Sequence, residues 1–348
     1  MLCARELAMA GMSVTVLERG ALGLESSWAG GGIISPLYPW RYDAAVTQLA
    51  RWGQGVYAEL AGALFEESGV DPEFTQNGLL ILDSDETEQA RAWAQQFGSH
   101  LEVVEAAAVQ DIEPRLEARS GEGIWMPEVA QVRNPRLVRA MRGSLAYHKV
   151  NVIEHCEVRG LQLVQDRVTG VNLANGEAIS AARVLVASGA WSAGLLQQAG
   201  ISVDVEPVRG QMLVFKGPPG LVSRIVLSRD RYVIPRRDGR VLVGSTLEHV
   251  GFEKVTTAEA RQELIAEDRR LIPALADFEM EHHWAGLRPG SPQGIPYICK
   301  YPLLENLYVN AGHFRNGVVL GPASARLMAD IILQREPILD FYAYKIYV

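Results

Sequence analysis

Cysteine, lysine and long apolar stretches are scarce in this chain, and each absence excludes a class of protein. The three cysteines, Cys3, Cys156 and Cys299, are widely spaced and odd in number. This pattern excludes a disulfide scaffold and a cysteine-based zinc site, so we expect reduced thiols in a cytoplasmic protein. The longest uncharged run, 184–203, is too rich in serine, glutamine and glycine to span a membrane. Residues 1–12 lack the apolar core of a signal peptide.

Lysine contributes only 5 of the 33 basic residues, and the other 28 are arginines. With 41 acidic residues the net charge is −8, which argues against a nucleic-acid-binding protein. The arginine excess follows either from codon usage or from a need to bind anions through planar guanidinium groups. With 348 residues, 48% of them hydrophobic, the chain is predicted to fold into two domains or one large one.

The first residues predict the second half of a βαβ unit. A helix over 1–10 ends at Gly11, an apolar strand follows over 13–17, and the acidic Glu18 stands at its end. In a dinucleotide-binding unit, a carboxylate at this position accepts hydrogen bonds from ribose hydroxyls. The alternative is that Glu18 only solvates the strand end. The strand and GxGxxG turn that open such a unit are not among these residues, so we expect them to be encoded upstream of Met1.

Later segments indicate an α/β fold with two domains. A strand–glycine–helix pattern over 183–199 is typical of a doubly wound parallel sheet. Strands expected at 208–216, 231–235 and 241–245 alternate apolar and polar residues, with a hairpin turn at Asp238-Gly239, and predict a large antiparallel sheet. We expect the chain to leave the first domain and return to it. The first domain is predicted over 1–75, 130–205 and 300–348, and the second over 76–129 and 206–299.

Two glycine-containing segments are candidate cofactor sites. The segment 26–32 (SSWAGGG) places two hydroxyls beside bare glycine amides, which suit phosphate oxygens or the edge of a flat ring. The segment 312–318 (GHFRNGV) lies between a predicted strand at 307–310 and a predicted helix at 317–333. The start of a helix carries partial positive charge and would stabilise a reduced flavin, which is anionic. The alternatives are a flexible loop and an ordinary strand-to-helix connection.

An arginine and a tyrosine are candidate substrate contacts. Arg288, in the segment WAGLRPG, can hold a carboxylate through two parallel hydrogen bonds, unless it is a surface residue of a turn. Strand alternation places Tyr232 and Ile234 on one face, where the tyrosine either offers its hydroxyl to a pocket or packs in the core. The adjacent His282 and His283 point to opposite faces of a strand, and we expect no metal site.

Five segments taken together resemble one enzyme family: ERG at 18–20, SSWAGGG at 26–32, RYVIPRRDGRVLVGST at 231–246, HWAGLRPGSPQGIPYI at 283–298 and GHFRNGVVLGPAS at 312–324. The set resembles the flavin-dependent glycine oxidases of bacterial thiamine biosynthesis, within the D-amino acid oxidase family. The resemblance extends from Met1 to about Pro337 and leaves the tail at 341–348 unmatched. Its most specific part is WAGLRPG followed by GHFRNG.

The resemblance implies an FAD domain on a mostly parallel sheet and a substrate domain on the antiparallel sheet. It implies that Arg288 binds the substrate carboxylate, with Tyr232 and Arg315 beside it as the other catalytic contacts. Members of the family are commonly cytoplasmic homotetramers, so we expect a homo-oligomer without a nucleic-acid or membrane partner. The implied FAD contacts are Glu18, Arg19, Ser26, Ser27, Gly31, Gly32, Ile33, Val158, His313, Phe314, Arg315, Asn316, Gly317, Val318 and Val319.

The implied reaction is the oxidative deamination of glycine and other small amino acids or amines. FAD and oxygen would convert glycine to the keto acid glyoxylate, ammonia and hydrogen peroxide. Two alternatives remain open: an oxidase or dehydrogenase of the sarcosine or D-amino acid type, and a non-catalytic fragment. Because the GxGxxG turn is not among these residues, we expect the chain as given to bind FAD weakly.

Overall fold

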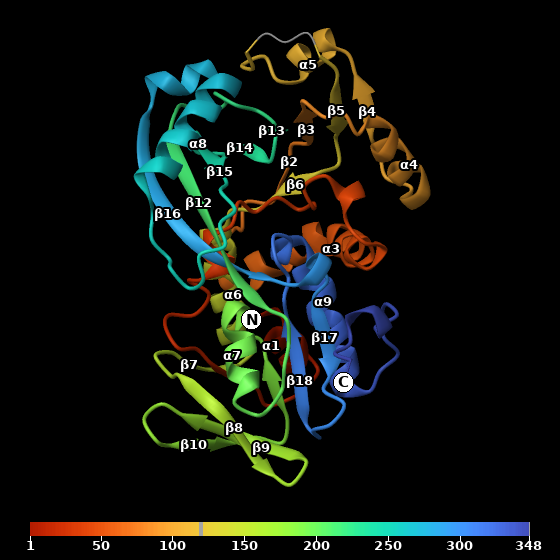
Figure 1. Cartoon of the computed structure of the whole chain (residues 1–348), viewed down its shortest axis with the longest axis vertical. Helices are drawn as coiled ribbons and strands as arrows, with labels where there is room; N and C mark the ends of the chain where they lie inside the picture. Colours follow the sequence, from red (N-terminus) through yellow and green to blue (C-terminus); the bar gives the residue numbers. More distant parts are fainter. Residues whose placement is uncertain (118–120, 348) are drawn as a thin grey trace.

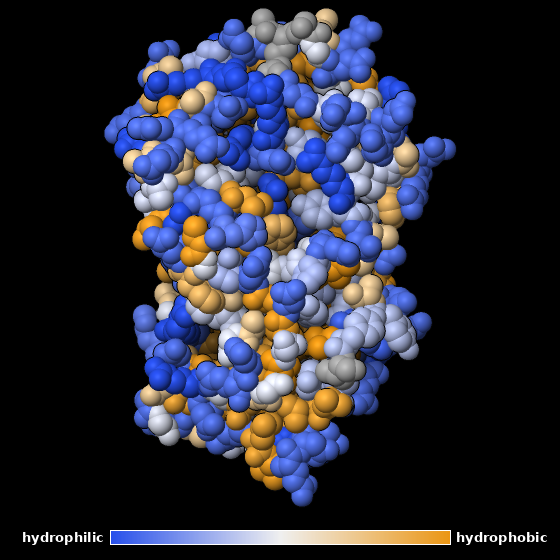
Figure 2. All heavy atoms as spheres, viewed as in Figure 1, coloured by the Kyte–Doolittle hydropathy of each residue, from blue (hydrophilic) through white to orange (hydrophobic). Residues whose placement is uncertain are grey.

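The computed structural model describes residues 1–117 and 121–347. Figure 1 shows one large sheet with its helices in the upper part of the view, and a group of helices with several small sheets in the lower part. The colours show that each part is assembled from separate stretches of the chain. On the face seen in Figure 2, hydrophilic residues cover most of the surface, and several apolar groups lie near the boundary between the two parts.

Eight strands form the large sheet, and six of its seven neighbouring pairs are antiparallel. The exception is the parallel pair of β3 and β13, which the long connection between them allows. The predicted antiparallel sheet is therefore confirmed except at this pair. In spatial order the strands are β16 (Glu279–Gly290), β12 (Glu206–Lys216), β15 (Arg240–Gly244), β14 (Arg231–Pro235), β13 (Ile225–Ser228), β3 (Leu79–Leu82), β5 (Gly123–Met126) and β4 (Glu102–Val104).

The two faces of the large sheet have different neighbours, because successive side chains of a strand point to opposite faces. On one face, Leu213 and Val243 share a buried core with Leu264 of helix α8. On the other face, Met212 and Tyr232 belong to a second core cluster, and this face carries the site described below. The helices of this part are α4 (Thr87–Phe97), α5 (Ala106–Ile112) and α8 (Ala258–Leu271).

The predicted doubly wound sheet is present as two separate parallel pairs, which confirms the α/β class. β1 (Thr15–Leu17) runs beside β7 (Asn151–Ile153), and β11 (Val184–Val186) runs beside β18 (Leu307–Ala311). Among the described residues no strand joins the two pairs. The remaining strands form antiparallel pairings: β17 (Tyr297–Lys300) with β18, β8 (Val158–Val164) with β9 (Arg167–Leu173), β10 (Ala178–Ser180) with β9, and β2 (Thr75–Gln76) with β6 (Ala130–Gln131).

Four helices pack together in the lower part: α1 (Leu2–Met9), α3 (Ala44–Ser68), α6 (Asn134–Tyr147) and α9 (Gly317–Leu333). Helix α3 begins after Asp43, whose carboxylate accepts a hydrogen bond from the Ala45 amide at 2.8 Å, and ends at Gly69 with a φ of 69°. In the described part of the chain, no helix has the length and apolar content needed to cross a membrane. Two shorter helices are α2 (Ser26–Ala29) and α7 (Ser192–Gln197).

Candidate functional site

A cavity of about 340 Å³ lies where the two parts of the molecule meet. Its wall combines the glycine segment 30–32, one face of the large sheet, the residues before and at the start of α9, and the first residues of the chain. Over the described ranges, the wall contains the arginines Arg288 and Arg315 and no acidic side chain. The field inside the cavity therefore attracts anionic ligands.

Arg288 reaches across the large sheet to form one side of this cavity. It lies on β16, and its side chain extends over β12 to Ser245, which follows the end of β15. The side chain passes over Gly210, where an added Cβ atom would lie 2.2 Å from the guanidinium nitrogens, so any other residue there would displace the guanidinium group. The alternative of a surface arginine in a turn is excluded, since Arg288 is half-buried within a strand.

The hydrogen bonds of Arg288 to the rest of its wall leave one edge of its guanidinium group to Tyr232 and to a ligand. Nη1 donates to the carbonyl oxygens of Arg209 (3.3 Å) and Thr246 (3.1 Å), and Nη2 donates to Ser245 Oγ at 2.7 Å. The group has five N–H donors, so one donor on Nη2 and the one on Nε remain, and the guanidinium group is also hydrogen-bonded to the Tyr232 side chain. A carboxylate that takes over this contact accepts two parallel hydrogen bonds from the Nε–Nη2 edge.

Tyr232 approaches the same cavity from β14. It pairs with Gly244 of β15, where a Cβ atom would lie 2.8 Å from the tyrosine ring, so the ring rests directly on the glycine backbone. The Tyr232 hydroxyl donates to the Met212 sulfur at 3.6 Å. Sulfur is a weak acceptor, and the hydroxyl therefore remains available to a stronger acceptor in the cavity.

Arg315 supplies the second positive charge of the wall. Burial lowers the pKa of the Arg288 guanidinium, and the nearby charge of Arg315 acts in the same direction. Across residues 1–117 and 121–347, neither arginine has a carboxylate within ion-pair distance. Glu248 attracts Arg288 from beyond ion-pair distance. Two partly desolvated cations without a direct ion pair are costly, so the binding of an anion stabilises this arrangement.

The side chain of the buried Arg236 donates hydrogen bonds to the backbone of the glycine segment and of the adjacent Val132. Its Nη2 donates to the Gly31 carbonyl at 2.7 Å and its Nη1 donates to the Val132 carbonyl at 2.9 Å. Gly32 has a φ of 80°, and a Cβ atom there would lie 2.0 Å from the Val132 carbonyl oxygen. The backbone of this segment is thus fixed in a form that requires glycine, with bare amides beside the cavity.

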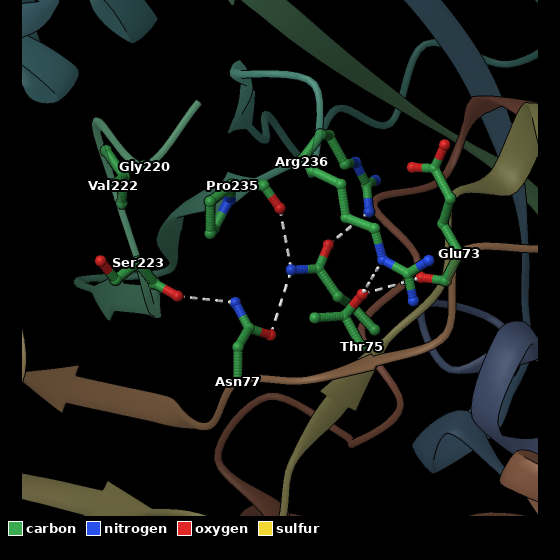
Figure 3. Close-up of a pocket in the computed structure, with 10 residues that line it drawn as sticks. Glu73, Thr75, Asn77, Gly220, Val222, Ser223, Pro235 and Arg236 are labelled. Atoms are coloured by element: carbon green, nitrogen blue, oxygen red, sulfur yellow. Dashed lines mark hydrogen bonds between the residues drawn. The ribbon is translucent and has the colours of Figure 1, made fainter. Parts of the chain in front are cut away.

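A second, smaller cavity of about 180 Å³ is lined in part by Arg236, whose Nη2 also binds the Gly31 carbonyl. Its lining is cross-linked by hydrogen bonds (Figure 3): the Gln131 amide donates to Asn77 Oδ1 at 3.1 Å and to the Pro235 carbonyl at 2.8 Å. The Asn77 amide in turn donates to the Ser223 carbonyl at 3.0 Å, whereas Arg236 Nε has no partner among the described residues. Because Arg236 and Gln131 hold the backbone next to the main site, we assign this cavity to the support of that site.

The segment around Ser26 is tied to the strand that carries Arg288. Ser26 Oγ donates to the Leu287 carbonyl at 2.6 Å, and Trp284 Nε1 donates to the Ala29 carbonyl at 3.0 Å. A Cβ atom at Gly286 would lie 2.5 Å from the Ala29 methyl group, so the two segments pack without space between them. The predicted cofactor segment and the predicted substrate arginine therefore form one packed unit.

The start of α9 forms the opposite wall. Its first turn holds no acidic residue, so the positive end of the helix dipole is not neutralised. Asn316, which precedes the helix, has a buried Nδ2 without a hydrogen-bond partner among the described residues. The buried Oδ1 of Asn310 also lacks a hydrogen-bond partner among these residues. Both side chains line the cavity. Buried amide groups without partners indicate positions that a bound molecule satisfies.

His313 contributes a neutral imidazole to this wall. Burial lowers its pKa to about 4, and its Nε2 lies 3.0 Å from Ser324 Oγ. At neutral pH the ring therefore adds no charge, and the positive field comes from the two arginines and the helix start.

Most predicted cofactor contacts line the cavity, and four do not. Glu18 and Arg19 after β1, Val158 in β8 and the buried Val319 in α9 lie outside the wall. Glu18 Oε1 instead accepts a hydrogen bond from the Gly20 amide at 2.9 Å, so the role of these four residues stays a prediction. The predicted contacts in the wall are Ser26, Ser27, Gly31, Gly32, Ile33, Tyr232, Arg288, His313, Phe314, Arg315, Asn316, Gly317 and Val318.

Several residues of the wall were not predicted as site residues. Gly210 could have been found, because a glycine inside a predicted strand signals the close approach of another group. Ser245 and Asn310 carry no such local signal, since their positions in the wall depend on contacts with residues far away in the sequence. Within the described ranges, no group of three or more histidine, cysteine or acidic side chains could hold a metal ion.

Comparisons with known proteins place the chain in a family. A family model described as FAD dependent oxidoreductase matches residues 1–331. The glycine oxidases of Pseudomonas aeruginosa and Pseudomonas putida are 50% and 48% identical over 341 residues, covering 98% of this chain and 93% of each relative. The crystal structure of glycine oxidase from Geobacillus kaustophilus has a TM-score of 0.94 at 26% identity, covering 99% of this chain and 94% of that one. The chain belongs to the family of FAD-dependent oxidoreductases.

FAD is the cofactor of this family, and the cavity fits it. The bare amides of the glycine segment, the start of α9 and the unpartnered amide of Asn316 are groups that bind the carbonyl and phosphate oxygens of such a cofactor. The family resemblance and the cofactor predicted from the sequence are thus confirmed.

Proposed function

We propose that this protein is an FAD-dependent oxidase that deaminates glycine and other small amino acids. The overall reaction is glycine plus oxygen plus water, giving glyoxylate, ammonia and hydrogen peroxide. In this reaction FAD, when bound, takes up the electron pair removed from the amino acid and passes it to oxygen. The protein's own part is to bind the substrate, orient its α-carbon and stabilise charge.

Arg288 binds the substrate carboxylate through the edge formed by Nε and Nη2. Tyr232 turns its hydroxyl from the weak sulfur acceptor of Met212 to the same carboxylate. Arg315 adds positive charge to the pocket. In the described residues that line the cavity there is no carboxylate to serve as a proton acceptor, so the mechanism relies on orientation. Bound FAD would accept the α-hydrogen of the uncharged amino acid together with its electron pair, and water would hydrolyse the resulting imine to the keto acid and ammonia.

The observation that carries this proposal is the hydrogen bonding of Arg288. Its bonds go to two carbonyl oxygens, the Ser245 hydroxyl and the Tyr232 side chain, and none of them is an ion pair. A guanidinium group that lines a cavity without an ion-paired carboxylate is a receptor for a carboxylate. The glycine oxidases that resemble this chain act on an amino acid that carries such a group.

The test is the spectrum of the purified protein together with a peroxide assay. A yellow protein that releases hydrogen peroxide and ammonia in equal amounts when glycine is added supports the proposal. A protein that binds FAD but releases no peroxide with glycine, sarcosine or small D-amino acids contradicts it. Comparison of the kcat/KM values for these substrates determines the preferred one.

Four further features belong to this proposal. We propose that the enzyme works in the cytoplasm, as a homotetramer, and that its product serves thiamine biosynthesis. We also propose the division into an FAD domain over 1–75, 130–205 and 300–348 and a substrate domain over 76–129 and 206–299. Size-exclusion chromatography with light scattering tests the tetramer.

A further inference from the structure

A polar cluster joins the two chain segments that hold the Arg288 guanidinium group. Nη1 of Arg288 donates to the carbonyl oxygen of Arg209, which lies in β12, at 3.3 Å and to that of Thr246, two residues after the end of β15, at 3.1 Å. Neither Arg209 nor Thr246 belongs to the described lining of the cavity. The orientation of the guanidinium group towards the cavity therefore depends on where these two carbonyl oxygens are held.

Glu248 connects the two segments through its backbone and through its side chain. Its amide donates to the Arg209 carbonyl at 3.0 Å, and its carbonyl accepts from the Arg209 amide at 2.9 Å. Its carboxylate accepts from Arg209 Nε at 3.0 Å and from Arg209 Nη2, from Gln211 Nε2 at 2.9 Å, and from the Thr246 hydroxyl. One carboxylate thus binds both segments that supply the acceptors of Arg288 Nη1.

The side chains that contact the Glu248 carboxylate all donate hydrogen bonds to it. Arg209 and Gln211 are buried. The Thr246 hydroxyl oxygen already accepts from the Gln211 amide at 2.9 Å, so its proton points to the carboxylate. Although partial burial acts to raise the pKa of Glu248, these hydrogen bonds hold it below its ordinary value. An ionised carboxylate is the group that accepts on both of its oxygens.

We propose that Glu248 is a positioning residue for the substrate carboxylate and that it acts through Arg288. Because Glu248 holds the carbonyl oxygens of Arg209 and Thr246 in place, it fixes the guanidinium group at Nη1 and presents the Nε–Nη2 edge to the substrate. The charge of Glu248 is paired with Arg209, so it does not compete with the substrate for Arg288. The inference rests on the proposed function, because it names a residue that prepares the same site.

A positioning role differs from a purely structural role in its dependence on Arg288. If Glu248 acts through the guanidinium group, its replacement has little effect on ligand binding where that group is already absent. If Glu248 only stabilises the sheet, its replacement disturbs the cavity to the same extent with or without the arginine. A double-mutant cycle therefore separates the two roles.

The experiment uses the FAD-loaded protein and four forms: wild type, Glu248→Gln, Arg288→Lys and the double variant. Glutamine has the shape of glutamate, but its NH2 group would face one set of the donors that surround the carboxylate. A titration with acetate, followed by the change in flavin absorbance, gives a dissociation constant without turnover. Steady-state kinetics with glycine give KM and kcat.

The matched control is Glu281→Gln on the same sheet. The Glu281 carboxylate accepts from Arg240 Nε at 2.5 Å and from Arg240 Nη2 at 2.6 Å, and this pair joins β16 to β15. The Glu281 side chain is 24% exposed, as is that of Glu248, and it lies outside the described lining of the cavity. The control therefore removes a similar ion pair that does not hold the acceptors of Arg288.

We expect Glu248→Gln to raise the acetate dissociation constant and the KM for glycine by roughly tenfold, with a smaller change in kcat and an unchanged flavin content. In the Arg288→Lys background, the same substitution changes the acetate constant by at most about twofold. Glu248→Asp keeps the charge on a shorter side chain, and we expect it to raise the acetate constant by roughly threefold. Glu281→Gln leaves both constants unchanged.

An acetate constant that neither Glu248→Gln nor Glu248→Asp changes overturns the proposal, as does a rise of the same size in the Arg288→Lys background. Thermal unfolding and the flavin spectrum show whether each variant keeps its fold. If Glu248→Gln does not fold, Glu248→Asp decides the question in the same cycle. Wild-type protein that binds acetate but does not oxidise glycine contradicts the proposed function, while the acetate constants still decide the role of Glu248.

Discussion

The two walls of the cavity are built in different ways. The wall around the glycine segment and the start of α9 presents backbone amides and a helix end, and its residues come from two short stretches of sequence. The wall on the large sheet presents side chains from separate strands: Arg288 on β16, Tyr232 on β14 and Ser245 after β15. In the first wall, the glycines leave backbone amides exposed to the cavity. In the second wall, glycines leave room for the side chains of neighbouring strands.

This difference separates two functions that substitutions can test one at a time. A change in the backbone-built wall is expected to weaken FAD binding, whereas a change in the wall on the sheet is expected to weaken carboxylate binding and leave FAD in place. The predictions below run from the largest expected effect to the smallest.

Gly210→Val is expected to have the largest effect. A side chain at this position would occupy the space of the Arg288 guanidinium group, 2.2 Å from its nitrogens. Displacement of the arginine by about 1 Å or more lowers kcat/KM for glycine by roughly a hundredfold, while FAD stays bound. The control is Gly62→Ala in α3, where no atom lies within 4 Å of the added methyl group. Normal glycine kinetics in Gly210→Val would disprove the placement of Arg288.

Arg288→Lys is expected to lower kcat/KM for glycine by roughly ten- to a hundredfold. Lysine cannot offer two parallel donors, and the loss of one charge-assisted hydrogen bond costs about 1.5–3 kcal/mol. The flavin content of the variant should equal that of the wild type, because Arg288 belongs to the wall on the sheet. Kinetics with glycine and a flavin spectrum check both statements, and an unaltered kcat/KM rules out the carboxylate assignment.

Asn316→Ala tests the opposite wall. Asn316 is the N-cap residue of α9, but its side chain makes no capping hydrogen bond, and its buried Nδ2 lacks a partner in the described residues. Removal of the Nδ2 group therefore breaks no hydrogen bond within the described part of the protein. We expect the FAD dissociation constant to rise by roughly tenfold, with a smaller change in the KM for glycine at saturating FAD. Equilibrium titration with FAD, followed by flavin fluorescence, measures the first effect. A variant that loses acetate affinity and keeps FAD affinity would contradict the division between the walls.

Tyr232→Phe is expected to be milder, with a KM for glycine raised by roughly tenfold at most. The substitution removes one hydroxyl whose bond to a charged group is worth about 1.5 kcal/mol and keeps the ring that rests on Gly244. Steady-state kinetics and the flavin content test this outcome. Loss of FAD from the variant would show that Tyr232 is structural and that the pocket is placed incorrectly.

His313 is expected to have the smallest effect on glycine oxidation, since its influence is on the dependence of stability on pH. Burial lowers its pKa from 6.5 to about 4, so between these values the unfolded chain binds a proton that the folded chain does not. The free energy of unfolding therefore falls as the pH decreases from 6.5 to 4, by at most about 1.4 kcal/mol per pH unit for one proton. Urea unfolding at several pH values measures this slope. The slope should be smaller in His313→Gln, and an equal slope in both proteins excludes the histidine as its source.

The sequence predicted the backbone-built wall more fully than the wall on the sheet. Its glycines, Asn316 and the start of α9 occur in two short motifs, and these residues line the cavity. Arg288 and Tyr232 were predicted as substrate contacts from their local sequence and from the family resemblance, whereas Gly210 and Ser245 were not predicted as site residues. Gly210 and Ser245 reach the cavity wall only because β12 pairs with β15 and β16, which are distant from it in the sequence. The register of these strand pairs cannot be read from a single sequence.

For the fold too, local elements were predicted from the sequence, whereas a pairing between distant strands was not. The helix predicted over 317–333 is confirmed as α9, with the same bounds. The parallel pairing of β3 with β13 was not predicted, because neither strand carries a sequence signal for the direction of its partner. Glu18 was predicted to contact the cofactor from the local pattern and from the family resemblance; it lies outside the cavity wall, and its role stays a prediction.

The most direct test of the account is the anaerobic addition of glycine to the FAD-loaded protein, with the flavin absorbance recorded in the wild type and in Arg288→Lys. The account predicts that glycine bleaches the wild-type flavin completely and that the Arg288→Lys flavin, present in the same amount, needs a much higher glycine concentration for the same change. A wild-type flavin that glycine does not reduce, or equal concentration dependence in the two proteins, contradicts the claim that Arg288 holds the substrate of an FAD-dependent glycine oxidase.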